Sequence, residues 1–322
     1  MAQRNTKSRH DHENLMTEIA HRYYIKKETQ ETIGTALSLP RMKVNRLLKQ
    51  AQDEGVVEIR IKLGSAQTQI VEQQMLEKFN IKRVLIAPDS ANPEQQRISV
   101  ASLVSGYLEA NLREGSVVAV GMGRNIAAVA DVNTSRVLQS TIFVCATGGA
   151  SEAGETGNAD HICRKLALSF GGRAQTLYAP AYVPDPELRR ALLANDTVRR
   201  SFRQALHADY VLVGIGDLGV DSHMVRVGWF SPDEIAKAQK KGVVGDLMGY
   251  DFFDLHGKPM NEELGGRVIG LSTDQLRQIN TVIAVASEVS KVPAIYGALR
   301  TGSIDVLATS LFNCQALLSM ED

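Results

Sequence analysis

Polar side chains between Arg41 and Lys62, in RMKVNRLLKQAQDEGVVEIRIK, have the chemistry of nucleic-acid recognition. They occupy one side of a predicted helix, with no acidic residue before Asp53: Arg41, Lys43, Asn45, Arg46 and Lys49. Arginine and asparagine form paired hydrogen bonds with the edges of guanine and adenine, and lysine binds phosphates. Because a solvated helix face usually mixes charges of both signs, this segregation predicts DNA binding. The alternative is an amphipathic helix that only dimerises or caps a domain.

Two short helices are predicted before that segment. Apolar residues recur at helical spacing in LMTEIAHRYYIKK, at Leu15, Ile19 and Tyr23. Thr29 can cap a second helix, which we expect to end near Leu39. These two helices would support the one that carries the basic side chains.

The third helix and the strand after it complete the first domain. Pro40 fits the first turn of this helix, and Gly55 would end it. Its buried positions are predicted to be Val44, Leu47, Leu48 and Ala51. The following residues, VVEIRIK, alternate apolar and polar side chains as a strand does. Three helices closed by such a strand predict a winged helix-turn-helix DNA-binding domain over residues 1–62.

Two glycine-rich turns later in the chain have the pattern of a ligand site. VVAVGMGRNI is an apolar strand that runs through Gly121, Gly123 and Arg124 into a helix. The free N–H groups at the start of such a helix favour a phosphate, although a glycine turn can also serve the backbone alone. ATGGA places Gly148 and Gly149 after the next strand. Adjacent carboxyl ends of parallel strands form a crevice, so the two turns predict a binding site between them.

Short runs rich in valine and isoleucine alternate with helical stretches from residue 81 onward. The runs predicted as strands are RVLIA, SVVAVGMG, STIFVCATGG, DYVLVGIG, TVIAVAS and IDVLATS. Helical stretches such as QIVEQQMLEKF, RISVASLVSGYLEANL and HICRKLALSF precede or separate them. This alternation predicts an α/β fold for residues 63–322, with a Rossmann-like, doubly wound parallel sheet.

The composition excludes several classes of protein. Lys and Arg number 36, as do Asp and Glu, so DNA binding must depend on a local patch. No apolar run approaches the roughly 18 to 20 residues of a membrane helix, and the N-terminus lacks a secretory core, which predicts a cytoplasmic protein. Cys145, Cys163 and Cys314 form no CxxC pair, so we expect no disulfide, metal or cofactor. Cys145 is expected to be a buried structural thiol rather than a nucleophile.

Several segments of the helical region match one known pattern. They are Tyr23-Tyr24, Thr29-Gln30, Ile33, Leu37, Arg41, Val44, Arg46-Leu47-Leu48 and Glu54-Gly55-Val56-Val57-Glu58-Ile59. On these residues the chain resembles the helix-turn-helix of the SorC family of bacterial sugar-responsive transcriptional regulators. The resemblance implies operator DNA as the partner and adds Thr29 and Gln30 to its contacts. Pro40 stands where the family commonly has serine, so the third helix lacks that capping hydroxyl.

The resemblance continues into the second domain. SorC-type effector domains are similar to sugar-phosphate isomerases and deaminases, in which a glycine turn and a late basic residue hold the phosphate. The matching positions in this sequence are Gly121, Gly123, Arg124, Asn125 and Lys291. Asp246, in VVGDLMGYDFFDLHG, matches a Gly-Asp segment whose carboxylate would accept sugar hydroxyls. Asn125 replaces a frequent threonine, and Asp246 and Lys291 could instead be a turn residue and a surface residue.

The resemblance implies a regulator of a carbohydrate-utilisation operon, controlled by a phosphorylated sugar or polyol and assembled as a dimer of dimers. One alternative is a sugar-phosphate isomerase or deaminase with an accessory N-terminal domain. GIGDLGVDSHMV is similar to a deaminase segment and would place His223 near Asp221 as a general base. Ser222 replaces the glycine of that segment, and its acidic continuation is missing, so we expect no enzymatic activity. A relative that has lost its effector is the other alternative; His161 is a further candidate to line the pocket.

Overall fold

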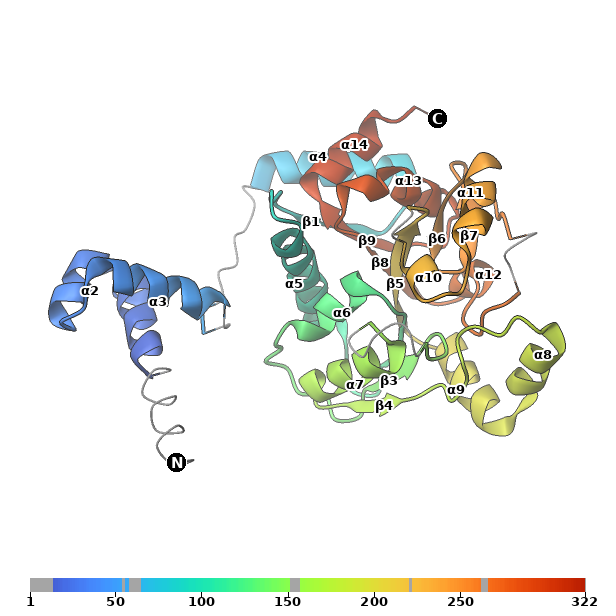
Figure 1. Ribbon diagram of the computed structural model, residues 1–322, viewed down its shortest axis with the longest axis horizontal. Coiled ribbons are helices and arrows are strands. Elements are labelled where there is room, and N and C mark those ends of the chain that lie inside the picture. Colours follow the sequence, from blue (N-terminus) through green and yellow to red (C-terminus); the bar gives the residue numbers. More distant parts are fainter. Residues whose placement is uncertain are drawn as a thin grey trace. The chain divides into compact units, whose positions relative to one another are not determined.

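The chain divides into two compact units, Met1–Lys62 and Leu63–Asp322 (Figure 1). The computed structural model describes residues 14–53, 56–57, 65–150, 157–219, 222–261 and 266–321. Within these residues, no helix is long and apolar enough to cross a membrane.

Helices make up most of the described part of the first unit. Residues 14–20 are α-helical and continue into the π-helical turn η1 (His21–Ile25), which is followed by α2 (Gln30–Ala36) and α3 (Arg41–Asp53). The fully or almost fully buried side chains of this unit include Met16, Ile19, Ile33, Val44, Leu47, Leu48 and Ala51. The buried stripe predicted for the third helix is therefore confirmed.

The turn between α2 and α3 differs from the prediction at both ends. The prediction extended the second helix to Leu39, but α2 ends at Ala36, because Ser38 takes a left-handed backbone conformation with φ of 54°. Pro40 was predicted in the first turn of the third helix and instead precedes it. Its carbonyl accepts a hydrogen bond from the N–H of Lys43 at 2.8 Å. Proline suits this place because it needs no backbone donor there.

The predicted wing lies mostly outside the described residues. Gly55 and residues 58–62 are not described, whereas Val56 and Val57 are. The N–H of Val57 donates to the carbonyl of Ala51 at 2.9 Å, which keeps the chain close to the end of α3. The wing itself stays a prediction.

The second unit is built on a nine-stranded sheet within the described residues. Its strands are β1 (Arg83–Ala87), β2 (Val117–Val120), β3 (Ile142–Cys145), β4 (Arg173–Gln175), β5 (Tyr210–Asp217), β6 (Val243–Leu247), β7 (Asp251–Asp254), β8 (Thr281–Val285) and β9 (Val306–Ser310). The order β1-β9-β8-β5-β2-β3-β4 is parallel throughout, and the β6–β7 hairpin joins the end of β5 in antiparallel fashion. All the strands predicted for residues 63–322 are confirmed, while β4, β6 and β7 were not predicted.

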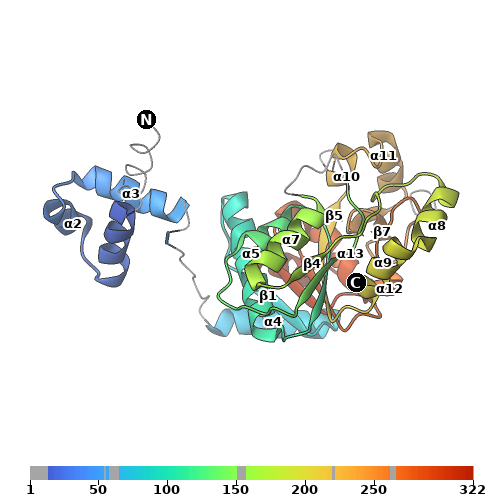
Figure 2. The ribbon, with the colours of Figure 1, turned by 90° about the horizontal axis from the view of Figure 1, so that it is seen from below.

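Helices cover both faces of this sheet (Figures 1 and 2). α5 (Pro93–Asn111), α6 (Arg124–Asp131) and α7 (Ala159–Phe170) pack side by side on one face. The other face carries α9 (Asp196–Leu206), α13 (Val292–Arg300) and α14 (Leu311–Ser319), and α4 (Ser65–Phe79) packs against α14. The remaining helical segments are α8 (Pro186–Ala194), α10 (His223–Arg226), α11 (Pro232–Lys240), α12 (Thr273–Leu276) and the 3-10 turn η3 (Val289–Lys291). The doubly wound parallel architecture is confirmed.

The direction of winding reverses between β2 and β5. From β2 the chain proceeds through α6 to β3 and then to β4, toward one edge of the sheet. From β5 it proceeds to β8 and β9, toward the other edge. Loops that leave the carboxyl ends of two such strands diverge to opposite faces and open a crevice between them.

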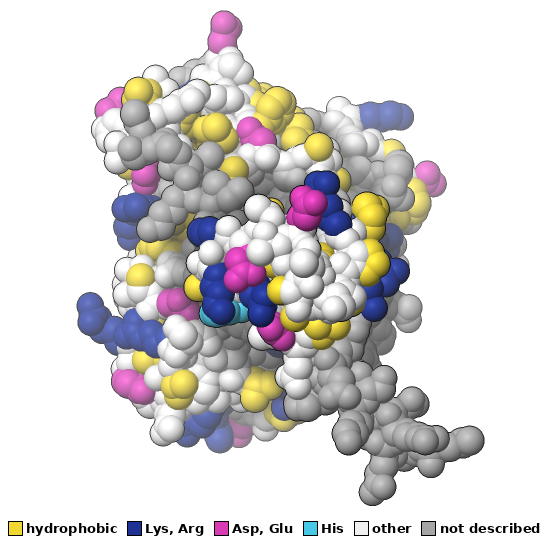
Figure 3. Space-filling view, turned by 90° about the vertical axis from the view of Figure 1, so that its left-hand side faces the viewer, with side chains coloured by type: hydrophobic (Ala, Val, Ile, Leu, Met, Phe, Trp, Pro, Cys, Tyr) yellow, Lys and Arg dark blue, Asp and Glu magenta, His cyan; other side chains and the backbone are white. Residues whose placement is uncertain are grey.

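Charged side chains of both signs are mixed on the face of the molecule shown in Figure 3, where basic, acidic and apolar groups adjoin. This mixture agrees with the formal net charge of zero. Binding of a polyanion therefore depends on the placement of particular side chains and not on a general positive field.

Candidate functional site

A cavity of about 90 Å³ lies at the carboxyl ends of β2 and β5. Residues 122–125 follow β2 and form one wall, and residues 214–217 end β5 and form another. The end of the β6 strand with its turn, and the η3 segment before α13, close the remaining sides. The cavity therefore lies where the winding reverses, which is the usual ligand position in open α/β sheets.

The turn after β2 leaves the start of α6 open toward this cavity. Gly123 has a φ of 107°, which favours glycine, and its N–H donates to the carbonyl of Gly157 at 3.2 Å. No side chain among the described residues caps α6. The unpaired N–H groups of the first turn and the positive end of the helix dipole favour an anion here, and the exposed Arg124 lies beside them.

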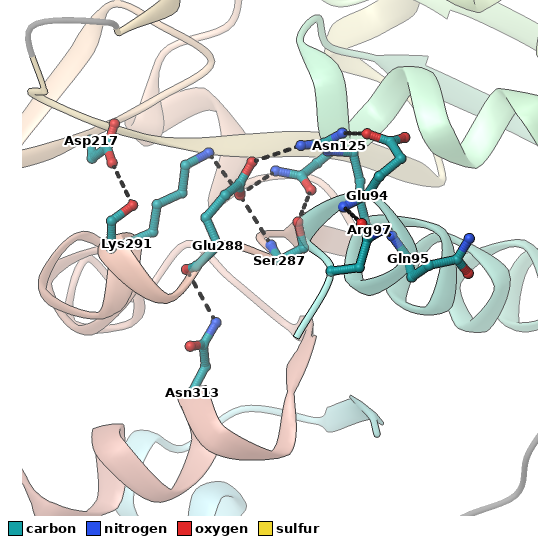
Figure 4. A network of polar contacts seen from close by, with 11 residues as sticks. Glu94, Gln95, Arg97, Asn125, Asp217, Ser287, Glu288, Lys291 and Asn313 are labelled. Carbon is teal, nitrogen blue, oxygen red and sulfur yellow. Dashed lines mark hydrogen bonds and ion pairs between the residues drawn. The ribbon is translucent and has the colours of Figure 1, made fainter. Parts of the chain in front are cut away.

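Asn125 is buried, and its side-chain amide is held at both ends (Figure 4). Its Nδ2 donates to Glu288 Oε2 at 2.9 Å, while its Oδ1 accepts from Ser287 Oγ at 2.7 Å. Lys291 Nζ lies 3.2 Å from the same Glu288 oxygen. The first turn of α6 and the η3 segment are thus joined through one carboxylate.

Glu288 is an ionised carboxylate in a largely buried position. Burial raises the pKa of this carboxyl. The charge of Lys291 and the hydrogen bond from Asn125 together outweigh burial and lower the pKa to about 2. Its Oε1 lies 3.8 Å from an Arg97 guanidinium nitrogen and, among the described residues, has no hydrogen-bond partner. The positive charge of Lys291 is therefore already neutralised at this site.

Asp246 places a second carboxyl in the cavity wall, near the end of β6. The side chain is fully buried; its Oδ1 accepts the N–H of Gly249, and its Oδ2 has no hydrogen-bond partner within the described residues. Burial raises the pKa of this carboxyl to about 7, against the opposing effects of the Gly249 hydrogen bond and the Lys291 charge. A buried oxygen without a partner is costly, and a ligand hydroxyl in the cavity would satisfy it.

Asp217 and Glu288 line the cavity and were missed in the sequence. Asp217 ends β5 and accepts a hydrogen bond from Ser290 Oγ at 3.1 Å. Both carboxylates follow an apolar strand closely, in YVLVGIGD and TVIAVASE. A polar residue at the carboxyl end of a buried parallel strand was the signal that could have identified them.

The residues predicted to bind an effector are divided between the cavity and its surroundings. Those that line the cavity are Gly123, Arg124, Asn125, Asp246 and Lys291.

The remaining predicted glycines lie where strands and loops pack closely. A Cβ at Gly121 would lie 2.9 Å from the carbonyl oxygen of Leu212, and one at Gly148 would lie 2.6 Å from that of Ala179. The N–H of Gly149 donates to the same Ala179 oxygen. The predicted crevice lay between β2 and β3, whereas the cavity lies between β2 and β5; a contact of these glycines with an effector stays a prediction.

α3 presents its predicted DNA-contacting side chains to solvent. The exposed residues are Arg41, Lys43, Asn45, Arg46 and Lys49, and no ion pair among the described residues involves the basic ones. Met42, which was not predicted as a contact, is 77% exposed in their midst. The face is therefore cationic, with one apolar group.

Thr29 and Gln30, the other predicted DNA contacts, lie at the start of α2. Thr29 is exposed and its hydroxyl accepts the N–H of Thr32 at 3.1 Å, which confirms the predicted cap. Gln30 is half-buried. Contact of either side chain with DNA stays a prediction.

The groups considered for catalysis are not assembled at the cavity by the described residues. Cys145 is 2% exposed, as expected of a structural thiol, and His161 is exposed but does not line the cavity. Asp221 and the side chain of His223 lie outside the described part of the chain. In that described part, no group of three or more His, Cys, Asp or Glu side chains could hold a metal ion.

Comparison with known proteins assigns most of this chain to one family. Residues 66–319 match the family model described as "Putative sugar-binding domain". The chain belongs to this family. The crystal structure titled "Putative Sugar-Binding Domain of Transcriptional Repressor from Vibrio fischeri" is 50% identical, covers 78% of this chain and 98% of its own, and superposes with a TM-score of 0.71.

Relatives of full length share the organisation of the whole chain. The transcriptional regulator LsrR of Enterobacter is 28% identical over 96% of this chain and 94% of its own length. The full-length sorbitol operon regulator SorC of Klebsiella pneumoniae, 22% identical, covers 95% of this chain and 98% of its own with a TM-score of 0.74, which shows a shared fold. The resemblance to SorC-type transcriptional regulators is confirmed, and the enzyme reading is not favoured by these relatives.

Proposed function

We propose that this regulator binds operator DNA through α3 and responds to a phosphorylated sugar or polyol in the cavity between β2 and β5. One observation carries the proposal. The cavity is lined by the uncapped start of α6, by Lys291 and by the Asp246 side chain, whose Oδ2 has no hydrogen-bond partner among the described residues. An anion-binding end and a hydroxyl-binding end on one small cavity suit a molecule that carries both groups.

The phosphate would lie at the start of α6. Donors and positive charge at that end come from the first backbone N–H groups of the helix and from Arg124. Lys291 adds an ammonium group, which Glu288 neutralises in this structure. The hydroxyl groups would extend toward Asp246 and Asp217, whose carboxyl oxygens accept hydrogen bonds. The side chains of Asp217, Asp246 and Lys291 are carried by β5, β6 and η3 respectively.

α3 would lie in the major groove as the recognition helix. Its exposed arginines and asparagine suit base edges, and its lysines suit phosphates. The exposed Met42 offers an apolar contact of the kind that recognises a thymine methyl group. Domain residues 1–62 would carry this function, and residues 63–322 would bind the effector and mediate assembly.

Control of transcription would follow from thermodynamic linkage. An effector that binds one arrangement of the DNA-binding units more tightly changes the affinity for the operator by the same factor. We propose a dimer of dimers in the cytoplasm, which would hold two operator sites at once. A carbohydrate operon is the expected target, since regulators of sorbitol and erythritol metabolism are among the relatives.

A two-step measurement tests this proposal. Phosphorylated sugars and polyols are first screened for thermal stabilisation of the full chain, together with their unphosphorylated counterparts. Each ligand that stabilises the protein is then tested for a change in affinity for DNA from the promoter region next to its own gene. Stabilisation by a phosphorylated ligand together with altered DNA affinity supports the proposal, and stabilisation only by unphosphorylated sugars contradicts it.

The proposal includes the absence of enzymatic turnover. No histidine among the described residues lines the cavity, and each of its three carboxyl groups has one oxygen held, by Lys291, Gly249 or Ser290. Incubation of the protein with each stabilising ligand, followed by product analysis, would show steady conversion if the isomerase or deaminase alternative were correct.

A further inference from the structure

Glu288 occupies the position that an effector's anionic group would take. Its Oε2 accepts hydrogen bonds from Asn125 Nδ2 at 2.9 Å and from the N–H of Ser287 at 3.3 Å, and it lies 3.2 Å from Lys291 Nζ. Figure 4 shows the side chains of Asn125 and Lys291 both directed at this carboxylate. An amide, a backbone N–H and an ammonium are the donors that proteins use for phosphates. In this structure all three of these donors bind the carboxylate of Glu288.

A ligand cannot reach these donors without meeting that charge. The side chains of Glu288 and Lys291 are only 17% and 12% exposed, so water screens their neighbours weakly. Asp217 and Asp246 line the same cavity, so carboxyl groups outnumber Lys291 and Arg124 there. A phosphate that approached Lys291 with Glu288 in place would be repelled.

A second position for the Glu288 carboxylate is already built. Arg97, on α5, has a guanidinium nitrogen 3.8 Å from Oε1, and its side chain is only 12% exposed. Both Glu288 Oε1 and Arg97 Nε are buried without a hydrogen-bond partner among the described residues. These two unpaired atoms are complementary, one an acceptor and the other a donor. Movement of the Glu288 carboxylate toward Arg97 would bring these two groups together and release Asn125 and Lys291.

We infer that Glu288 is a specificity-determining residue: it occupies the anion site, and a phosphate enters by displacing its carboxylate toward Arg97. The inference rests on the proposed function of the cavity. A ligand with a single carboxylate would only replace the Glu288 carboxylate at Lys291, so it would gain little binding free energy. A phosphate carries up to two charges and three acceptor oxygens, and it can use the start of α6 as well. The site therefore selects phosphate esters over sugar acids and free polyols.

The Glu288→Gln variant tests this inference, with inorganic phosphate and acetate as probes. The amide keeps the size of the side chain and removes its charge. Isothermal titration of the full chain at pH 8 should show phosphate binding about tenfold tighter or more than in the wild type, because one like charge is gone. The affinity for acetate should rise by a larger factor, so the ratio of phosphate affinity to acetate affinity should fall. Unchanged or weaker phosphate binding overturns the inference.

The Glu94→Gln variant is the matched control. Glu94 pairs with the other side of the Arg97 guanidinium, but its side chain is 64% exposed and does not line the cavity. Because Glu94 competes with Glu288 for Arg97, the same change of carboxylate to amide should raise phosphate binding only slightly, and much less than Glu288→Gln does. An equal gain in both variants would mean that only the general charge of the region matters, which overturns a specific role for Glu288.

The Arg97→Met variant tests the receiving position and remains informative if the glutamine variant folds poorly. Without Arg97 the displaced carboxylate has no partner, so phosphate should bind several-fold more weakly. When Arg97→Met is combined with Glu288→Gln, it should no longer weaken phosphate binding, since there is no carboxylate at position 288 to displace. A penalty of equal size in both backgrounds overturns the displacement. The Lys291→Ala variant tests the proposed site separately. Loss of phosphate binding in this variant supports the site, whereas phosphate binding as tight as in the wild type refutes it.

Discussion

The carboxyl group of Asp246 lies directly over the backbone of Gly216, its partner across the β5–β6 pair. A Cβ built on Gly216 would lie 2.1 Å from Asp246 Oδ2. The close approach holds this oxygen in the cavity wall without a hydrogen-bond partner within the described residues. The absence of a side chain at Gly216 thus permits the buried carboxyl group that we assign to the ligand's hydroxyls.

The Gly216→Ala variant should therefore impair effector binding without unfolding the protein. The added methyl group must displace the Asp246 carboxyl group, so affinity for a sugar phosphate should fall by about tenfold or more, while operator binding persists. Gly106→Ala, on α5, is the control, because its Cβ would meet no atom within 4 Å and Gly106 does not line the cavity. Titration calorimetry on both variants decides the matter, and equal affinities for the effector would contradict the assigned role of Asp246.

Asp246 should also make the free energy of unfolding fall as the pH rises toward 7. Burial raises the pKa of this carboxyl from 3.8 to about 7 in the folded protein. Between those two values the folded state holds a proton that the unfolded state has lost, so the free energy of unfolding falls as pH rises. The loss from this group is on the order of 1 to 4 kcal/mol and is complete above about pH 7.

The Asp246→Asn variant isolates this effect. Because the amide does not titrate, the free energy of unfolding of the variant should fall by less between pH 5 and pH 7.5 than that of the wild type. At pH 7.5 the variant should be the more stable of the two proteins. Urea unfolding at a series of pH values measures both quantities. Parallel curves for the two proteins would show that Asp246 is ionised throughout.

Local periodicity was enough to predict α3 and the central strands of the sheet. Val44, Leu47 and Leu48 repeat at helical spacing, so the burial of α3 could be read directly, and apolar runs marked the central strands. The β6–β7 hairpin was missed because Gly245 and Asp246 interrupt its apolar pattern. One of these interruptions, Asp246, brings a carboxyl group to the cavity wall.

The arrangement of the site was harder to predict, because it depends on contacts between distant segments. Asn125 and Glu288 are 163 positions apart in the sequence and meet through a hydrogen bond. The local sequence around either residue does not predict that pairing. The crevice was predicted between β2 and β3 because those strands are consecutive, but strand order is set by the direction of winding, which places β5 beside β2. Lys291 could be predicted only through resemblance.

Lys291 should separate the effector response from DNA binding. Its ammonium is the cation nearest Glu288 in the cavity and lies in the second unit. Replacement by alanine should abolish the thermal stabilisation by sugar phosphates and leave operator affinity without effector unchanged. Lys240→Ala, which removes an exposed lysine of α11, is the control and should behave as wild type. Stabilisation that survives in Lys291→Ala would place the phosphate elsewhere.

Arg46 should determine sequence-specific DNA binding. It is exposed on α3 between the buried Val44 and Leu47, so its removal should not disturb the helical core. If its guanidinium contacts a base edge, Arg46→Ala should weaken operator binding by ~1 to 3 kcal/mol and relax the preference at one base pair. Lys49→Ala, one turn further along, should lower affinity for all sequences alike if it binds a phosphate. Mobility-shift titrations on the operator and on substituted operators distinguish the two, and an unchanged Arg46→Ala affinity would remove this residue from the recognition surface.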